Sequence, residues 1–351
     1  MPVDKFALRA IGLRMLLNRL QRVCAAAALV TAVGLPLCAP LRAQNTGTTG
    51  SAWTPPKKVW GHPDIEGIYT NKDEATTPLE RPDGFNGRTV EDVSAAELES
   101  LAKARQALAA KIAGGIGGAE TGAGPTHWYE HLQGNGSRPW LIIDPPDGKL
   151  PGMTPQAQKR EAAIAALNDA RNGEGRADSW LDRSMYDRCI TRGLPGSMMP
   201  AIYGNAYEIV QAPEYVAIRY EMIHETRVIP LDNHPHVGPA IREYLGDARG
   251  HWEGNSLVVE TTNFTDRTHF GYNNRYNSQT FTLTERFTPV GPNTLQWQVT
   301  FNDPEVWTRP FTFAMPLTRD NSQPVFEYAC HEGNLGLEHI LSAARAEERQ
   351  R

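Results

Sequence analysis

Residues 281–301 read FTLTERFTPVGPNTLQWQVTF, and this stretch decides the fold class of the chain. Polar and apolar residues alternate strictly through residues 294–301, so one face of the segment is apolar and the other is polar. Residues 281–287 repeat the alternation, and the turn sequence PVGPN separates the two segments. A period of two is that of a β-strand with one buried face. The stretch therefore predicts two neighbouring antiparallel strands.

Short segments of the same kind continue on both sides of this pair. They are rich in β-branched and aromatic residues and are separated by turn residues such as QAPE and NSQP. The eight predicted strands cover residues 205–211, 215–222, 226–231, 256–262, 280–287, 294–301, 307–315 and 324–330. Closure of such an antiparallel meander removes free edges and leaves an interior for one small ligand. We predict a mainly β fold in which the meander closes into a lipocalin-like barrel.

The region before the barrel contains helix signals. Residues 94–97 (SAAE) form a capping box, and leucine and isoleucine recur behind it at helical spacing until GGIGG at 114–118. Thr154 and Pro155 give an N-cap followed by proline at the first helical position. A strand candidate lies between the two helices, and residues 337–351 predict a short surface helix. We predict a helix- and loop-rich elaboration at about residues 90–175 within a single domain of residues 59–351.

The chain begins with the residue order of a secretory signal peptide. Four arginines precede an apolar, alanine-rich run at residues 23–40, and LRAQN follows it. This run is shorter than the roughly 20 residues that cross a bilayer, which makes a retained anchor the weaker alternative. We predict a signal peptide at residues 1–43, a flexible N-terminus at residues 44–58, and a periplasmic or secreted protein without a stable membrane anchor.

Signal cleavage would leave two cysteines, Cys189 and Cys330. Disulfides persist in exported proteins, so a bridge between these two residues is the simplest inference. The alternative is a nucleophilic thiol at Cys330, because His331 follows it directly. Neighbours in an extended chain point to opposite faces, which disfavours the thiol.

The composition excludes several classes of function. The net charge of −5 comes without a basic stripe, which makes nucleic acid and anionic membranes poor partners. The chain has no G-x-G-x-x-G, no P-loop and no G-x-S-x-G, so we expect no nucleotide cofactor and no serine hydrolase. We expect a small-molecule ligand or substrate, no cofactor and no bound metal. The oligomeric state is left open.

Five of the ten histidines lie between residues 220 and 270, among several carboxylates. Histidine titrates near neutral pH, so an imidazole beside a carboxylate suits acid/base chemistry. The predicted catalytic residues are His236, His251, His224, Glu253 and Glu285, with Glu221 and Glu225 as further acidic partners. The predicted substrate-binding residues are Arg227, Arg249, Trp252, His331 and Glu332. The plainer interpretation is that HWEG forms a turn in which Trp252 packs on the barrel and the polar residues stay in water.

Glu285 has a second interpretation. It shares a strand face with Phe281, Leu283 and Phe287, so the alternation points it into the apolar interior. A buried carboxylate must be paired or hydrogen-bonded. Glu285 is therefore either the structural partner of an inward arginine or a functional acid with a raised pKa.

A metal site is the weakest alternative. Asp232, His234 and His236 form a D-x-H-x-H pattern, in which two histidines one residue apart can ligate zinc. Pro235 interrupts a regular strand, and a proline-rich turn with solvated histidines explains the pattern equally well.

Several motifs resemble a family of exported bacterial proteins. They include EMIHETRVIPLDNHPH at 221–236, GDARGHWEGNSLVVETTNF at 246–264 and EYACHEGN at 327–334, and the likeness extends from about Trp60 to the end of the chain. The resemblance implies export and includes both mature cysteines, which fits a disulfide. It implies no particular activity. The family more often has glycine and arginine where LDNHPH has Asn233 and His234, which favours His236 over His234 as a functional residue.

Three functions follow from these patterns. The first is an exported enzyme that uses His/Glu acid/base catalysis, as a lyase, hydrolase or isomerase, on a small organic or glycosidic compound. The second is a noncatalytic periplasmic, lipocalin-like carrier of a hydrophobic small molecule. The third is a metal-dependent hydrolase.

Overall fold

The structure is a computed structural model that describes residues 53–116, 130, 136–169, 177–201, 203–270 and 275–350. Trp53–Arg351 form one compact unit. The predicted signal peptide at residues 1–43 lies outside the described residues, as do residues 44–52. Lys57 bridges to Pro63, and Nζ of Lys58 lies 3.3 Å from Oδ1 of Asp64, so local contacts begin before residue 59.

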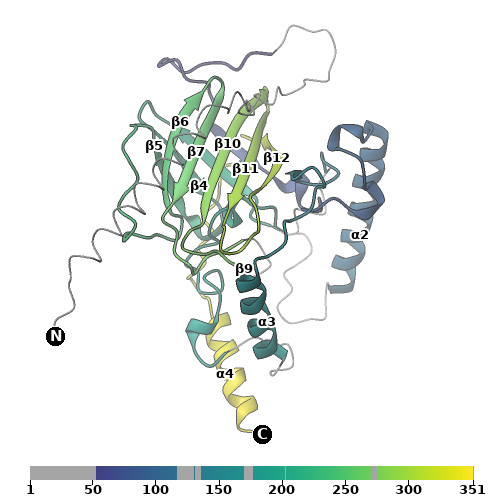
Figure 1. Cartoon of the computed structure of the whole chain (residues 1–351), viewed down its shortest axis with the longest axis vertical. Coiled ribbons are helices and arrows are strands. Elements are labelled where there is room, and N and C mark those ends of the chain that lie inside the picture. The colour runs from purple at the N-terminus through teal and green to yellow at the C-terminus, as the bar shows by residue number, and fades with distance from the viewer. Residues whose placement is uncertain are drawn as a thin grey trace, which may run out of the picture. The chain divides into compact units, whose positions relative to one another are not determined.

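A mainly antiparallel sheet dominates this unit, which confirms the predicted fold class (Figure 1). Its strands pair in the order β5-β4-β3-β1-β12-β11-β10-β7-β6, and β2 also pairs with β12. The strands are β1 (Gly67–Thr70), β2 (Ile142–Asp144), β3 (Ala206–Gln211), β4 (Tyr215–Tyr220), β5 (Thr226–Pro230), β6 (Asp247–Glu253), β7 (Ser256–Thr262), β10 (Thr282–Gly291), β11 (Thr294–Asn302) and β12 (Phe311–Arg319). A separate two-stranded sheet joins β8 (His269–Phe270) to β9 (Arg275–Tyr276).

The two ends of the strand order meet. β5 and β6 lie side by side, so the sheet curls into a nearly closed barrel. Gly250 in β6 permits this approach, because a Cβ there would lie 2.7 Å from Cδ2 of Leu231 and 2.8 Å from Cγ2 of Ile229.

Strand register decides which residues face the barrel interior. Val259, Glu285 and Val299 are direct partners across β7, β10 and β11, and all three are buried. The alternation predicted for residues 281–301 is therefore confirmed, since the apolar positions of β10 and β11 are buried. Large side chains pack together in the interior, including Trp297, Phe287 and Phe313.

The strand prediction was wrong in three places. Residues 324–330, predicted as a strand, belong to no strand in the structure. In this segment the backbone oxygen of Val325 accepts a hydrogen bond from Nη2 of Arg219 on β4. The strands β1 and β6 were not predicted, although both belong to the main sheet.

The described helices are α2 (Ala95–Ile116), α3 (Pro155–Asp169) and α4 (Gly336–Glu348), which match the three predicted helices (Figure 1). The capping box is present, because Ser94 N donates to Oε2 of Glu97 at 3.0 Å and Glu97 N donates to Oγ of Ser94 at 3.3 Å. Thr154 Oγ1 likewise accepts from Ala157 N at 3.2 Å. Short 3-10 turns occupy Lys72–Glu74, Asp83–Phe85, Val90–Asp92, Trp180–Asp182, Gly196–Met198 and Met222–His224.

Cys189 and Cys330 form a disulfide with their Cα atoms 5.6 Å apart, which confirms the predicted bridge. The bond anchors residues 324–330 beside the segment that precedes β3. Across the described residues, no helix combines the length and apolar character needed to cross a membrane.

Candidate functional site

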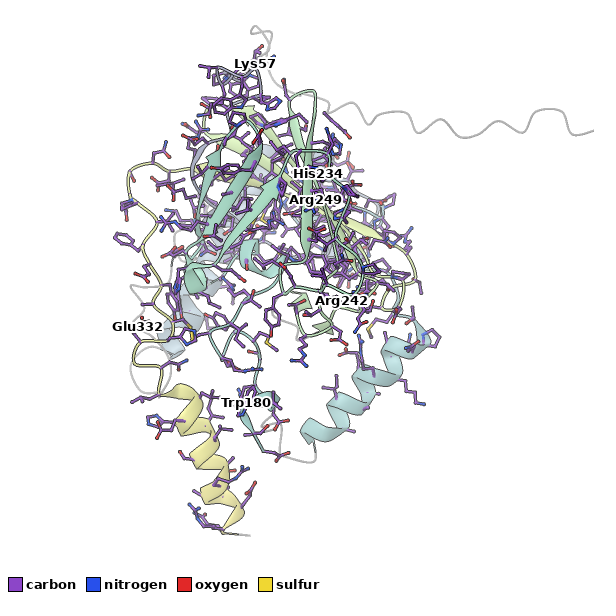
Figure 2. All side chains as sticks on the ribbon, turned by 90° about the vertical axis from the view of Figure 1, so that its left-hand side faces the viewer. Lys57, Trp180, His234, Arg242, Arg249 and Glu332 are labelled. Atoms are coloured by element: carbon purple, nitrogen blue, oxygen red, sulfur yellow. A yellow bond between two sulfur atoms is a disulfide. The ribbon has the colours of Figure 1, made fainter. Side chains whose placement is uncertain are left out.

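The predicted site residues fall into separate groups. His236, Arg249, His251 and Glu253 lie on β6 or in the loop before it, whereas His331 and Glu332 lie in an exposed turn after the disulfide. Figure 2 shows this separation, with His234 and Arg249 beside the strands and Glu332 near the C-terminal helix. A single shared site does not form from these residues.

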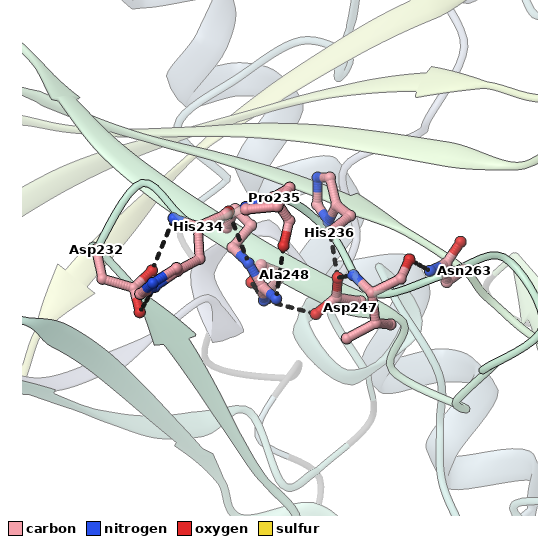
Figure 3. A network of polar contacts seen from close by, with 9 residues as sticks. Asp232, His234, Pro235, His236, Asp247, Ala248 and Asn263 are labelled. Carbon is pink, nitrogen blue, oxygen red and sulfur yellow. Dashed lines mark hydrogen bonds and ion pairs between the residues drawn. The ribbon is translucent and has the colours of Figure 1, made fainter.

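The first group fastens a loop to the barrel wall (Figure 3). Nδ1 of His236 donates to Oδ2 of Asp247 at 2.9 Å, and Nη1 of Arg249 donates to Oδ1 of the same carboxylate at 2.6 Å. Arg249 also donates to the backbone oxygens of His234 at 3.2 Å and Pro235 at 3.3 Å. The Arg249 guanidinium therefore holds this loop against β6. Its N–H groups are used in these contacts and do not form a substrate-binding site.

The next residues on β6 form a surface pair. Nε2 of His251 lies 3.1 Å from Oε1 of Glu253, and Nη1 of Arg286 lies 2.9 Å from Oε2. The Arg286 hydrogen bond and then the His251 hydrogen bond lower the pKa of Glu253. His251 is 42% exposed and Glu253 is 49% exposed, so both groups are solvated. Trp252 points the opposite way and packs against the core, as the plainer interpretation of HWEG expected, but His251–Glu253 end strand β6 and do not form the expected turn.

Strand alternation explains why one shared acid/base site is not assembled. His251 is the register partner of Val258, which is in turn the partner of Arg286, and this row lies on the outer face. Glu285 is the residue next to Arg286 on β10, so its side chain points to the opposite face of the strand, into the interior. The predicted set is therefore divided: His236, His251 and Glu253 lie at the outer side of β6 and the loop before it, Glu285 lies in the interior, and the exposed His224 lies beside Tyr328.

The interior location holds a buried ion pair. Arg227 on β5 donates to Glu285 on β10 from Nη1 at 2.5 Å and from Nη2 at 3.2 Å. Nε1 of Trp297 donates to Oε1 of the same carboxylate at 3.1 Å. Burial disfavours the charged guanidinium, but the negative charge of Glu285 raises the pKa of Arg227 above its ordinary value. Glu285 is thus the structural partner of an inward arginine, the first of its two predicted alternatives.

Two buried tyrosines lie beside this pair. Tyr207 on β3 and Tyr220 on β4 are register partners that face the interior, each 1% exposed. Among the described residues, neither phenol oxygen has a hydrogen-bond partner, and the same is true of Nε of Arg227. Tyr220 is the register partner of Tyr207, and Arg227 is the register partner of Ile218 two residues earlier on β4, so the three buried donors lie on adjacent strands and on the same inner face. Burial raises the pKa of both phenols.

Glu225 adds a titratable carboxyl at this end of the barrel. Oγ1 of Thr191 donates to its Oε2 at 2.7 Å, and its charge acts on the phenol of Tyr220. Burial raises the pKa of Glu225 to about 7, although the Thr191 hydrogen bond acts in the opposite direction. The preceding residues Ile223 and His224 have φ values of 63° and 45°. Such left-handed geometry is strained for a β-branched residue, and strain of this kind gathers at functional sites.

An outer shell of tyrosines covers the same end. The ring centroids of Tyr203 and Tyr328 lie 6.4 Å apart, and burial raises the pKa of Tyr186 and Tyr328. The guanidinium of Arg192 lies 5.6 Å from the ring centroid of Tyr186, and its charge also acts on Tyr207. Arg192 therefore connects the outer tyrosines with the interior ones.

We call this assembly the barrel-end site, because β3 starts, β4 ends and β5 starts beside it. His224 belongs to its margin, since Nδ1 donates to the backbone oxygen of Tyr328 at 3.0 Å. The site consists of Glu225, Thr191, Arg192, Tyr186, Tyr203, Tyr207, Tyr220, Arg227, Glu285 and Tyr328.

Sequence reasoning named His224, Glu225, Arg227 and Glu285 but missed the tyrosines. Tyr207 and Tyr220 lie at inward positions of two predicted strands. A tyrosine hydroxyl that points into an apolar interior needs a hydrogen-bond partner, so the strand pattern could have identified both as candidate site residues. The outer tyrosines carry no such signal, because they lie in irregular segments far apart in the chain.

The D-x-H-x-H residues are engaged in other contacts. Nδ1 of His234 lies 2.7 Å from Oδ2 of Asp232, while His236 donates to Asp247. Within the part of the chain that the structure describes, no group of three or more His, Cys, Asp or Glu is arranged to hold a metal ion.

Fold and site together define an antiparallel β-barrel protein with a polar, tyrosine-rich cluster at one end. No protein-family model matches the chain. No curated protein is significantly similar to it. Among solved structures, it is similar to a variant of the fluorescent protein UnaG, with 11% sequence identity and a TM-score of 0.21. That match covers 38% of this chain and 85% of the other.

Proposed function

We propose that the protein binds a small organic molecule in the barrel-end site. One observation carries the proposal: the hydroxyls of Tyr207 and Tyr220 and Nε of Arg227 are buried donors without acceptors among the described residues. Each unsatisfied buried donor costs about 1–3 kcal/mol. A ligand that supplies the missing acceptor would remove this cost.

We further propose that the protein works outside the cytoplasm. The disulfide is of the kind that persists in oxidising compartments, and the sequence begins with the residue order of a signal peptide. Membership of the family of exported bacterial proteins belongs to the same proposal. A periplasmic or secreted binding protein would meet its ligand outside the cell membrane.

Acid/base catalysis is the second candidate function, and Glu225 favours it. A carboxyl with a pKa of about 7 is present in both protonation states at neutral pH, as a general acid or base requires. The enzyme would then be a lyase, hydrolase or isomerase whose base is Glu225 rather than one of the histidines on β6.

Binding is tested by saturation-transfer NMR with three probes that share one ring: acetophenone, benzamide and benzoate. We expect at least one probe to bind, and we expect the double variant Tyr207→Phe, Tyr220→Phe to lose that binding. Tyr215→Phe is the matched control, because Tyr215 lies on the same strand as Tyr220 but is exposed. Absence of binding by all three probes, or equal binding by the double variant, would overturn the proposal and indicate that water satisfies the donors.

A further inference from the structure

We infer that the barrel-end site takes a neutral carbonyl compound and that Glu225 moves a proton at the carbon next to the carbonyl. This inference rests on the proposed function, because it requires that the site binds a ligand. It is carried by the donors at Tyr207, Tyr220 and Arg227, by the charge balance of the site and by the position of Glu225.

The donors define the group that the ligand must present. Two phenol hydroxyls and one guanidinium N–H gather without an acceptor among the described residues. A carbonyl oxygen has two lone pairs and accepts two hydrogen bonds readily. An enolate oxygen carries a further lone pair and a negative charge, so three donors suit it better than they suit the ketone. The site thus matches the charge that develops during enolisation.

The charge balance favours a neutral ligand over a carboxylate. The positive charge of Arg227 is already matched by Glu285, which is fully buried beside it. A ligand carboxylate would bring a second negative charge next to Glu285 in a place of low dielectric constant. Arg192 is the other cation of the site, but its guanidinium lies over the ring of Tyr186 in the outer shell.

Glu225 is placed to exchange a proton with such a ligand. Its carboxyl is fixed by the hydroxyl of Thr191 and interacts electrostatically with the Tyr220 phenol. The backbone N–H of Tyr220 donates to the backbone oxygen of Glu225 at 2.9 Å, and the next register pair is Arg219 and Thr226, so Glu225 lies directly opposite Tyr220 beside the start of β5. Burial raises the pKa of Glu225, which keeps the carboxylate basic enough to accept a proton from carbon.

The proposed step consumes no other reactant. The Glu225 carboxylate takes a proton from the carbon next to the carbonyl, and the electron pair of the broken C–H bond forms a C=C bond. The π electrons of the carbonyl move to its oxygen, which accepts hydrogen bonds from Tyr207, Tyr220 and Nε of Arg227. The carboxyl then returns the proton to the same carbon or to another carbon of the enolate. The class of reaction is tautomerisation, racemisation or double-bond isomerisation.

The test uses acetophenone in deuterium oxide, with loss of the methyl proton signal followed by NMR. We expect the full-length protein to accelerate this exchange above buffer. The rate should increase with pH around a midpoint of about 7, because the base must be ionised. Glu225→Gln should reduce the catalysed rate by about 100-fold or more, as for loss of a general base. Tyr220→Phe should reduce it by about 100- to 1,000-fold, as for loss of an oxyanion donor.

Glu208→Gln is the matched control, because Glu208 lies on the outer face of β3 and pairs there with Arg219. It should leave the exchange rate unchanged. If Glu225→Gln does not fold, the pH profile of the unmodified protein decides, and a profile without a midpoint near 7 overturns the assignment of Glu225.

The outcomes separate this inference from the proposed function. Acetophenone that binds without accelerated exchange overturns the proton transfer and supports a carrier. Benzoate that binds more tightly than acetophenone and benzamide overturns the neutral-carbonyl assignment while supporting a ligand site. Full exchange activity in folded Glu225→Gln overturns the role of Glu225. No binding by any probe overturns both proposals.

Discussion

The buried pair of Arg227 and Glu285 makes a strong prediction about stability. The two side chains are 3% and 0% exposed, and Glu285 also accepts from Trp297, so neither charge has water to replace its partner. Glu285→Gln preserves the shape but leaves the guanidinium buried without a counter-charge. We expect it to lower the free energy of unfolding by about 3–5 kcal/mol, as for a broken buried ion pair.

A double-mutant cycle measured by urea unfolding tests this expectation. Arg227→Met should cost a similar amount, and the double variant should cost clearly less than the sum, with a coupling of about 2–3 kcal/mol. The matched control is Glu253→Gln, which removes the solvated partner of Arg286 and should cost less than about 1 kcal/mol. A loss for Glu285→Gln as small as that of the control, or a coupling near zero, would refute the reasoning.

Three further predictions concern the bridge, the carboxyl and the barrel closure. The double variant Cys189→Ala, Cys330→Ala should lower the free energy of unfolding by about 2–5 kcal/mol, because the bridge closes a loop of 141 residues. An unfolding midpoint that is the same in the double variant, and the same with and without reductant in the unmodified protein, would contradict this prediction. Burial raises the pKa of Glu225 from 4.5 to about 7, so the folded protein holds a proton that the unfolded chain releases in this range. Stability from this group is full below pH 4.5 and falls by about 3 kcal/mol as the pH rises through 7. Urea unfolding of Glu225→Gln at about pH 5 and pH 8 should lack this decrease, and an unchanged pH dependence counts against it. Gly250→Ala should cost about 1–3 kcal/mol through its contacts with β5. Gly238 has open space around it, so Gly238→Ala should be nearly neutral when both variants are compared by thermal unfolding. Equal losses of stability for the two variants would contradict the role of Gly250 in barrel closure.

Much of the secondary structure was predictable because its causes are local. The capping box at Ser94 and the N-cap at Thr154 satisfy backbone groups within a few residues, so α2 and α3 start where the sequence predicts. The alternation at residues 281–301 likewise fixes which face of β10 and β11 is buried. These signals need no knowledge of the rest of the chain.

β6 shows where local signals fail. Of its inward positions, Ala248 and Gly250 have little or no side chain and only Trp252 at its end is large, while its outward positions are Asp247, Arg249 and other polar residues. Such a sequence has no run of alternating apolar residues to indicate a strand. β6 forms because β7 offers a hydrogen-bonding edge and because Gly250 lets β5 approach. Both reasons are tertiary.

The candidate site was only partly predictable for a related reason. The histidines are neighbours in sequence, and strand alternation separates them in space, as His251 and Glu285 illustrate. Tyr207 and Tyr328 are remote in sequence, and the strand order together with the disulfide brings them to one end of the barrel. Glu225 was named with Glu221, but its hydrogen bond to Thr191, from a distant segment, distinguishes it only in the folded chain.

The position of the disulfide has a consequence for the protein after damage. Cys189 precedes β3 and Cys330 follows β12, so every strand from β3 to β12 lies within one covalent ring. A single cut by a protease in any turn of that ring leaves the two pieces joined by the disulfide. They separate into two fragments on a denaturing gel only after the disulfide is reduced. β1 and β2 lie outside the ring and are joined to it through one chain connection and their pairing with neighbouring strands. A cut between β1 and Cys189 instead leaves a separate fragment that carries β1, so unfolding releases at least one barrel strand even when the disulfide is intact.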